Sequence, residues 1–260
     1  MKIIITIHLL LLSILLESCR QGTAVLPYMP LSAFSGDTLA YLMYNFEDRK
    51  SLYSGKCLDT LLRDLEIPIK SAIPGSDPNN ISICPGILFS FEDDQTTSTK
   101  LHNKNKMFFI DMDFDPALDN YALYNIIHGG CMDFCPALKD FLDSKTIGGP
   151  TVSMSPKKLE NAEMASRLSD LKASTGDLTT GFSANLFNYT IYTDKSSITF
   201  IPYAAKTTNT IMVNDIEVAS GRKSQVINLN STNNTVQIAV TCADGTLTKT
   251  YYVNIVKTRK

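Results

Sequence analysis

The chain has 260 residues, a formal net charge of −2 and 19% charged residues. A protein that binds nucleic acid through its phosphates carries a basic patch. Neither the charge balance nor any run of Lys and Arg provides such a patch here. A hydrophobic content of 44% is that of a folded protein and excludes a chain that is disordered throughout.

The N-terminus has the pattern of an export signal. Lys2 supplies a positive charge, and an apolar run with few polar residues extends from Ile3 to Leu16. The run is shorter than the roughly 20 residues that cross a bilayer, and it has the size of a signal-peptide core. We therefore expect residues 1–18 to be removed from the mature protein.

The residues Leu16-Glu17-Ser18-Cys19 resemble the lipobox of bacterial lipoproteins. In that family the signal peptide is cut before the cysteine, whose thiol carries a diacylglycerol. The resemblance thus implies that Cys19 is the lipidated N-terminus, in the cell envelope at the outer membrane of a Gram-negative bacterium. Glu17 departs from the usual pattern, and a secretory signal with an incidental cysteine is the alternative.

The rest of the chain divides into four parts. Residues 19–36 contain Pro, Ser and Gly and are typical of a tether. Residues 37–150 mix strand and helix patterns and predict an α+β domain of unknown family. Residues 151–167 predict a linker with a short helix at 157–165, and residues 168–260 predict an all-β Ig-like sandwich.

The first half of the α+β domain shows the patterns of both strands and helices. The aromatic run 38–46 predicts a strand, and residues 86–91 and 107–110 predict buried strands joined by a polar loop over 92–106. A helix is predicted where leucines recur with the spacing of one helix face, at Leu58, Leu61, Leu62 and Leu65.

Two helix starts follow in the second half of this domain. Asp115 before Pro116 has the pattern of an N-cap and first helical residue, and that helix extends to about Ile127. A second helix is predicted to start at Pro136. Gly and Pro then interrupt the pattern between 148 and 156, which predicts the end of the domain.

Beyond residue 167 apolar and polar residues alternate with a period of two, as in half-buried strands. Asn214-Asp215 and Asp244-Gly245 separate such segments and suit tight hairpin turns. The clearest segments are Phe187 to Ile191, Ile198 to Phe200, Val236 to Cys242 and Tyr251 to Ile255.

This part of the chain resembles the cadherin-like β-sandwich domain, an Ig-like module of bacterial envelope proteins. The order and spacing of several short blocks carry the resemblance over residues 168–258: Leu168-Ser169-Asp170-Leu171, Tyr189-Thr190-Ile191, Ile211 to Asp215, Asn234 to Ile238, Ala243 to Thr246 and Lys249-Thr250-Tyr251. Asp215 stands where the family more often has Gly. The resemblance implies a role in adhesion, polymer contact or spacing, and the calcium clusters of animal cadherins are not apparent.

Five cysteines follow Cys19, so at least one thiol stays unpaired within the chain: Cys57, Cys84, Cys131, Cys135 and Cys242. Disulfides are permitted in an exported protein, and the sequence does not choose their pairing. Cys131 and Cys135 with His128 and Asp133 lack the paired spacing of a structural zinc site, so a disulfide or buried thiols are favoured. Cys242 is predicted to be a small core residue.

The remaining candidate chemistry is the acidic pair Asp111 and Asp113, at the end of a predicted strand. The segment is similar to the first motif of lipoprotein acid phosphatases of the haloacid dehalogenase type, which implies a nucleophile, an acid/base and bound Mg²⁺. Asp115 stands where that motif has Thr, and too little chain follows before residue 150 for the rest of such a fold. Structural carboxylates at an exposed strand end are the favoured interpretation.

We therefore expect a non-enzymatic lipoprotein of the cell envelope that acts in binding, adhesion or spacing. It would be held to the membrane by lipid and would contact a protein or polysaccharide, without nucleic acid, cofactor or metal. The alternatives are an envelope hydrolase that uses Asp111 and Asp113, and a structural component of an outer-membrane complex.

Overall fold

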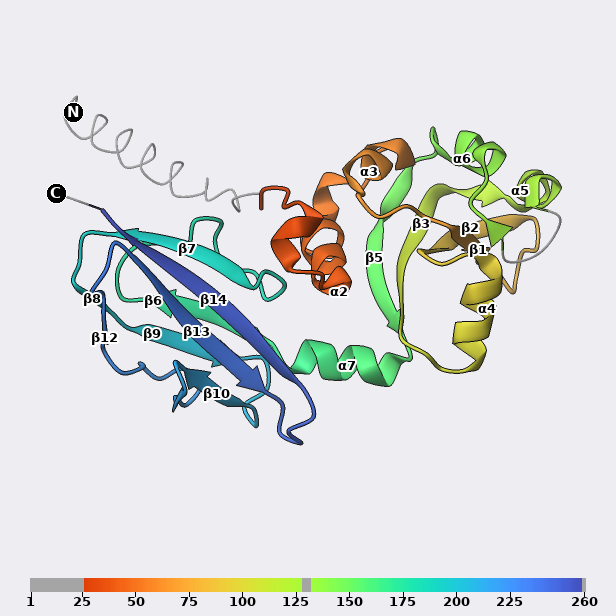
Figure 1. The fold of residues 1–260 in the computed structure, drawn as a ribbon. Coiled ribbons are helices and arrows are strands. Elements are labelled where there is room, and N and C mark those ends of the chain that lie inside the picture. Colours follow the sequence, from red (N-terminus) through yellow and green to blue (C-terminus); the bar gives the residue numbers. More distant parts are fainter. Residues whose placement is uncertain (1–25, 128–131, 259–260) are drawn as a thin grey trace, which may run out of the picture.

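The computed structural model describes residues 26–127 and 132–258. An N-terminal region of helices around one sheet lies beside a β-rich C-terminal region, an arrangement compatible with two domains (Figure 1). Helix α2 lies between the two regions, and α7 connects them. Apolar side chains from both regions form one continuous buried core.

The N-terminal sheet is antiparallel, with strand order β4-β1-β2-β3-β5. Its longest strand, β3, pairs with β2 on one side and β5 on the other. The strand bounds are β1 Ser71–Pro74, β2 Ile83–Ser90, β3 Met107–Asp119, β4 Met132–Asp133 and β5 Ile147–Ser155.

The described helices of this region are short, and most of them lie around the sheet. The predicted leucine-rich helix is confirmed as α3, and the helix predicted at Pro136 is confirmed as α6. The helices are η1 Leu31–Phe34, α2 Thr38–Leu42, η2 Met43–Glu47, η3 Lys50–Leu52, α3 Leu58–Asp64, α4 Asp94–His102, α5 Asn120–Ile127, α6 Pro136–Leu142 and α7 Lys157–Ala165.

The strand predicted over 38–46 is wrong, because this segment forms α2 and η2. Asp37 caps α2, its carboxylate accepting the Ala40 amide at 2.9 Å. Apolar residues lie on every side of the segment and are 0–1% exposed, including Leu39, Tyr41 and Phe46. A helix that is buried on all sides lacks the amphipathic period of a surface helix, so its run of aromatic residues has the composition of a strand.

The tether predicted over 19–36 is also wrong for the residues that the structure describes, 26–36. Phe34 of η1 is 1% exposed. Tyr28 donates a hydrogen bond to Glu66 at 2.7 Å, and the Met29 amide donates to the Asn45 side chain at 3.1 Å. This segment is therefore packed onto the fold. Cys19 and the predicted signal peptide lie outside the described residues.

Two predictions next to β3 are wrong, the loop before it and the helix start at Asp115. The polar loop predicted over 92–106 contains α4, which Asp93 caps by accepting the Thr96 amide at 2.7 Å. Asp115 is not an N-cap, because β3 continues past it to residue 119. Asp119 instead accepts the amides of Tyr121 and Ala122 at the start of α5, at 2.9 and 3.1 Å.

The interruption predicted between 148 and 156 is wrong as well, because these residues belong to β5. Pro150 lies opposite Met112 of β3. The strand is at the edge of the sheet, where a proline costs no ladder hydrogen bond on its outer side. Only the helix predicted at 157–165 remains of the linker, and it is confirmed as α7.

The C-terminal region has one sheet of order β11-β10-β13-β14-β7 and two shorter pairs, β6-β9 and β12-β8. In Figure 1, β13 and β14 lie in front of β6 and β9, as two layers of a sandwich. The predicted alternating segments are confirmed as strands. The bounds are β6 Leu168–Ala173, β7 Asn188–Thr193, β8 Ser197–Ile198, β9 Phe200–Ala204, β10 Thr210–Val213, β11 Ile216–Glu217, β12 Ile227–Asn228, β13 Asn233–Thr241 and β14 Thr248–Lys257.

Turn chemistry accounts for the register of this sheet. Asn214 and Asp215 have φ of 46° and 63° and connect β10 to β11, as the hairpin prediction requires. Asp215 thus adopts the left-handed conformation, which Asp tolerates in a turn. Gly245 has φ of 70° in the turn between β13 and β14.

Candidate binding site

The acidic pair lies on the exposed side of β3. Asp111 and Asp113 are both exposed and point to the same side of the sheet, as alternate strand residues do. They line a pocket of about 370 Å³, and Asp113 also lines a second pocket of about 490 Å³. Burial and then the neighbouring Asp113 charge raise the pKa of Asp111.

The polar groups nearest this pair have partners within the chain. Lys50 and Ser54 line the second pocket with Asp113. Lys50 is bound to Glu47 at 3.0 Å, however, and the Ser54 hydroxyl donates to the Gly148 carbonyl. Within the described residues no three His, Cys, Asp or Glu side chains gather to hold a metal ion.

The cysteines of the described residues are all unpaired thiols. Cys84 is buried, and Cys135 is half-buried at the start of α6. His128 and Cys131, the partners considered for Cys135, lie outside the described residues. The prediction that Cys242 is a core residue is wrong. Cys242 follows the end of β13, where its thiol donates to the Asp244 carboxylate at 2.9 Å.

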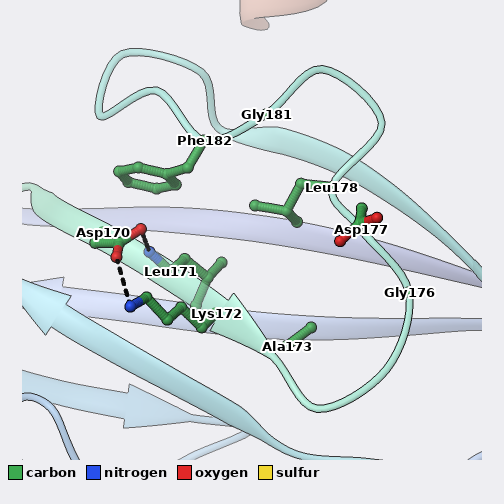
Figure 2. A pocket seen from close by; sticks show the side chains of 9 residues that line it. All are labelled: Asp170, Leu171, Lys172, Ala173, Gly176, Asp177, Leu178, Gly181 and Phe182. Carbon is green, nitrogen blue, oxygen red and sulfur yellow. Dashed lines mark hydrogen bonds and ion pairs between the residues drawn. The ribbon is translucent and has the colours of Figure 1, made fainter. Parts of the chain in front are cut away.

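The sandwich has a groove beside β6 with a volume of about 540 Å³ (Figure 2). Asp170, Leu171 and Lys172 come from the strand, and Leu178 and Phe182 come from the loop that follows it. In Figure 2 the Phe182 ring lies over the strand near Asp170, and Leu178 and Asp177 lie farther along the loop, toward the Ala173 end of the strand. The groove therefore mixes apolar walls with opposite charges.

The chain itself protects the strand edges at this groove. The Asp170 carboxylate accepts the Leu171 amide at 2.8 Å and lies 3.8 Å from the Lys172 ammonium. Across the groove, the Thr179 amide donates to the Thr190 carbonyl at 3.1 Å, so the loop bonds to β7. An added strand would have to displace these bonds, as is usual for a protected sheet edge.

Residues 168–258 match the family described as the cadherin-like beta sandwich domain. This stretch is a cadherin-like domain. No curated protein matches the chain. None of the described helices is both long enough and apolar enough to cross a membrane.

The cadherin-like domain is tied to the N-terminal region at both ends of the α2–η2 segment. At one end, Asp37 binds the Lys249 ammonium of β14 at 2.7 Å. At the other end, Asp48 accepts hydrogen bonds from Ser183 at 2.7 Å and Asn185 at 2.9 Å. The pKa of Asp48 is raised, because the effect of burial exceeds the lowering by these two hydrogen bonds.

Helix α7 adds a third connection. Glu163 binds Lys249 at 2.7 Å and Lys106 at 2.8 Å. Arg167 is 1% exposed, and its guanidinium lies 5.6 Å from the Phe187 ring and donates to the Asn185 side chain. We call these charged residues the interdomain ionic cluster: Asp37, Asp48, Lys106, Glu163, Arg167 and Lys249.

No pattern in the sequence predicts this cluster. Asp37 and Lys249 are 212 positions apart, and neither stands in a recognisable motif. The available signals were Asp37 as the N-cap of a helix and Lys249 within an otherwise alternating strand. Neither signal names a partner, so only the folded arrangement brings these charges together.

Proposed function

We propose that this protein is a non-enzymatic binding or adhesion protein of the cell envelope, held by a lipid on Cys19. The observation that carries the proposal is the cadherin-like domain at residues 168–258, which is consistent with a binding or adhesion-type role. The lipobox-like residues Leu16 to Cys19 support the anchor. The outer membrane of a Gram-negative bacterium is the location that this anchor implies.

The interdomain ionic cluster supports a role in which the cadherin-like domain is held in a defined orientation toward its partner. Burial raises the pKa values of Asp37 and Glu163, but hydrogen bonds and charge from Lys249, and from Lys106 in the case of Glu163, bring them below their ordinary values. Such lowered values mean that the ion pairs stabilise the folded state. The N-terminal region would then act as a stiff base that holds the cadherin-like domain away from the membrane.

The anchor is tested by Cys19→Ala, produced in a Gram-negative host. We expect the wild type to take up labelled fatty acid and to sediment with membranes. The variant should lose the label and leave the membrane fraction, because no diacylglycerol can be attached. Ser18→Ala is the matched control, since a small residue before the cysteine is preserved. Unchanged labelling and sedimentation of Cys19→Ala would contradict the anchor.

The binding role is tested by adhesion of coated beads. Beads coated with the detergent-solubilised protein should adhere to cells of the source bacterium and to its extracellular polymer. Free protein should compete, because it occupies the same partner sites. Beads coated with heat-unfolded protein are the control. Equal adhesion by folded and unfolded coatings, or no competition, would count against a binding protein.

A further inference from the structure

We propose that the outer face of β13, β14 and β7 binds a neutral, hydroxyl-rich polysaccharide; this inference rests on the proposed binding function and names its partner class. The strand register determines which residues point outward. Thr235 lies opposite Asn254, and Gln237 lies opposite Tyr252. The residues of this outer face are Asn233, Thr235, Gln237, Ala239, Thr241, Thr248, Thr250, Tyr252, Asn254, Val256, Asn188, Thr190 and Tyr192.

The first observation is that the outer face carries no charge. None of these residues is Asp, Glu, Lys, Arg or His, in a chain of which 19% is charged. The two charges that β14 carries, on Lys249 and Lys257, alternate with the outer-face residues and so lie on the other side of the strand. Lys249 binds within the interdomain ionic cluster, and Lys257 donates to the Leu229 carbonyl at 3.2 Å. An anionic polymer or lipid headgroup calls for Lys and Arg, which this face lacks.

The second observation is the kind of polar group on the face. Threonine hydroxyls and the amides of Asn and Gln both donate and accept hydrogen bonds, as sugar hydroxyls do. The Thr235 hydroxyl donates to Asn254 at 2.9 Å, and the hydroxyls of Thr241 and Thr248 are 2.9 Å apart. These cross-strand bonds hold the polar groups in fixed positions before any ligand arrives, which lowers the ordering cost of binding.

The third observation is a pair of exposed aromatic rings among these polar groups. Tyr252 is 39% exposed and Tyr192 is 57% exposed. Tyr192 lies opposite Val256, and Val256 is four residues from Tyr252, so about 13 Å separates the two positions along the strands. A tyrosine ring offers an apolar surface with a polar end, which suits the face of a sugar ring. The stretch between them has room for sugar rings in line.

A protein partner fits this face less well. Protein interfaces have an apolar centre, whereas Val256 and Ala239 are the aliphatic side chains here and both are half-buried. The adjoining edges at β6 and β7 are already bonded by Asp170 and by the loop at Thr179. Addition of a strand from a second copy is therefore not the favoured mode.

The test is affinity electrophoresis of the full chain, solubilised in detergent, in gels that contain one soluble polysaccharide each. The neutral probes are dextran, mannan, galactan and a mixed-linkage β-glucan, and alginate is the anionic probe. We expect at least one neutral probe to retard the protein, with little dependence on salt. Tyr252→Ala and Tyr192→Ala should each weaken that association at least tenfold. Tyr121→Ala is the matched control, because Tyr121 is an exposed tyrosine (61%) on α5, outside this face.

Three results would overturn the inference: no retardation by any neutral probe, retardation by alginate alone, or equal weakening by Tyr121→Ala. Self-association that the two tyrosine substitutions abolish would assign the face to a second copy instead. If beads coated with the folded wild type do not adhere, the proposed function itself has failed. Bead adhesion that persists without retardation by any neutral probe is a failure of this inference alone.

Discussion

Neighbouring residues of β14 show how a single strand serves two environments. Tyr251 is 0% exposed, and its hydroxyl accepts the Leu168 amide at 3.0 Å and donates to the Ala184 carbonyl at 2.8 Å. Burial raises the pKa of Tyr251 to about 12, so the hydroxyl stays protonated at neutral pH. Tyr252 points to the opposite side and lies on the outer face.

This contrast predicts different costs for the same chemical change. Tyr251→Phe should lower the free energy of unfolding by about 1–3 kcal/mol, because it leaves the Leu168 amide and the Ala184 carbonyl without their partner. Tyr252→Phe should change it by less than about 0.5 kcal/mol, as is usual at the surface. Urea unfolding followed by circular dichroism measures both. Equal costs would show that the buried hydroxyl contributes nothing.

Among single residues, the sequence predicted those whose role is local. Asn214 and Asp215 form the expected turn because the turn chemistry is contained in two adjacent residues. Asp111 and Asp113 share a face of β3, as their spacing requires. Whether a third group joins them depends on residues that are distant in sequence. The placement of Lys50 and Ser54 beside Asp113 was therefore not predictable.

At the scale of elements, patterns succeeded where one face is buried and the other is exposed. The alternation of β13 and β14 and the leucine spacing of α3 are of this kind. They failed for α2, which is buried all round, and for β5, which contains Gly149 and Pro150. The remainder of β3 beyond Asp115 was missed because Asp-Pro has the same pattern as a helix start.

The start of α5 gives a prediction at this scale. Asp119→Ala should lower the free energy of unfolding by about 0.5–2 kcal/mol, because its carboxylate accepts the Tyr121 and Ala122 amides. Asp115→Ala is the matched control. Asp115 is exposed within β3, so this change should stay within about 0.5 kcal/mol. Thermal unfolding of the two variants side by side decides the matter. A larger loss in Asp115→Ala would restore Asp115 as the helix cap.

For the molecule as a whole, the division into a mixed N-terminal region and a β-rich C-terminal region followed from local patterns. The contacts that join the two regions did not follow from such patterns. Residues 26–36, expected as a tether, pack onto the N-terminal region, and the α2–η2 segment lies between the regions. Long-range pairs such as Asp37 with Lys249 fix this arrangement. Linear sequence carries no signal for such pairs.

The interdomain ionic cluster predicts a pH dependence of stability. The pKa values of Asp37 and Glu163 lie below their ordinary values of 3.8 and 4.5. The folded state therefore binds fewer protons at these groups than the unfolded state does. Their stabilisation is complete above the ordinary values and is lost as the pH falls through the lowered ones. Below pH 4.5 the unfolding temperature of the wild type should thus fall.

Lys249→Gln isolates this effect, because it removes the charge that Asp37 and Glu163 share. The variant should lose roughly 3 kcal/mol of stability at neutral pH, since two partly buried carboxylates lose their cation. Its decline in acid should also be shallower. Asp48, whose raised pKa acts in the opposite direction, is present in both proteins and cancels from the comparison. Lys195→Gln, which removes an exposed lysine, should follow the wild type at every pH. Calorimetry from neutral pH to pH 3 that gave parallel curves for Lys249→Gln and the wild type would show that the cluster does not hold the two regions together.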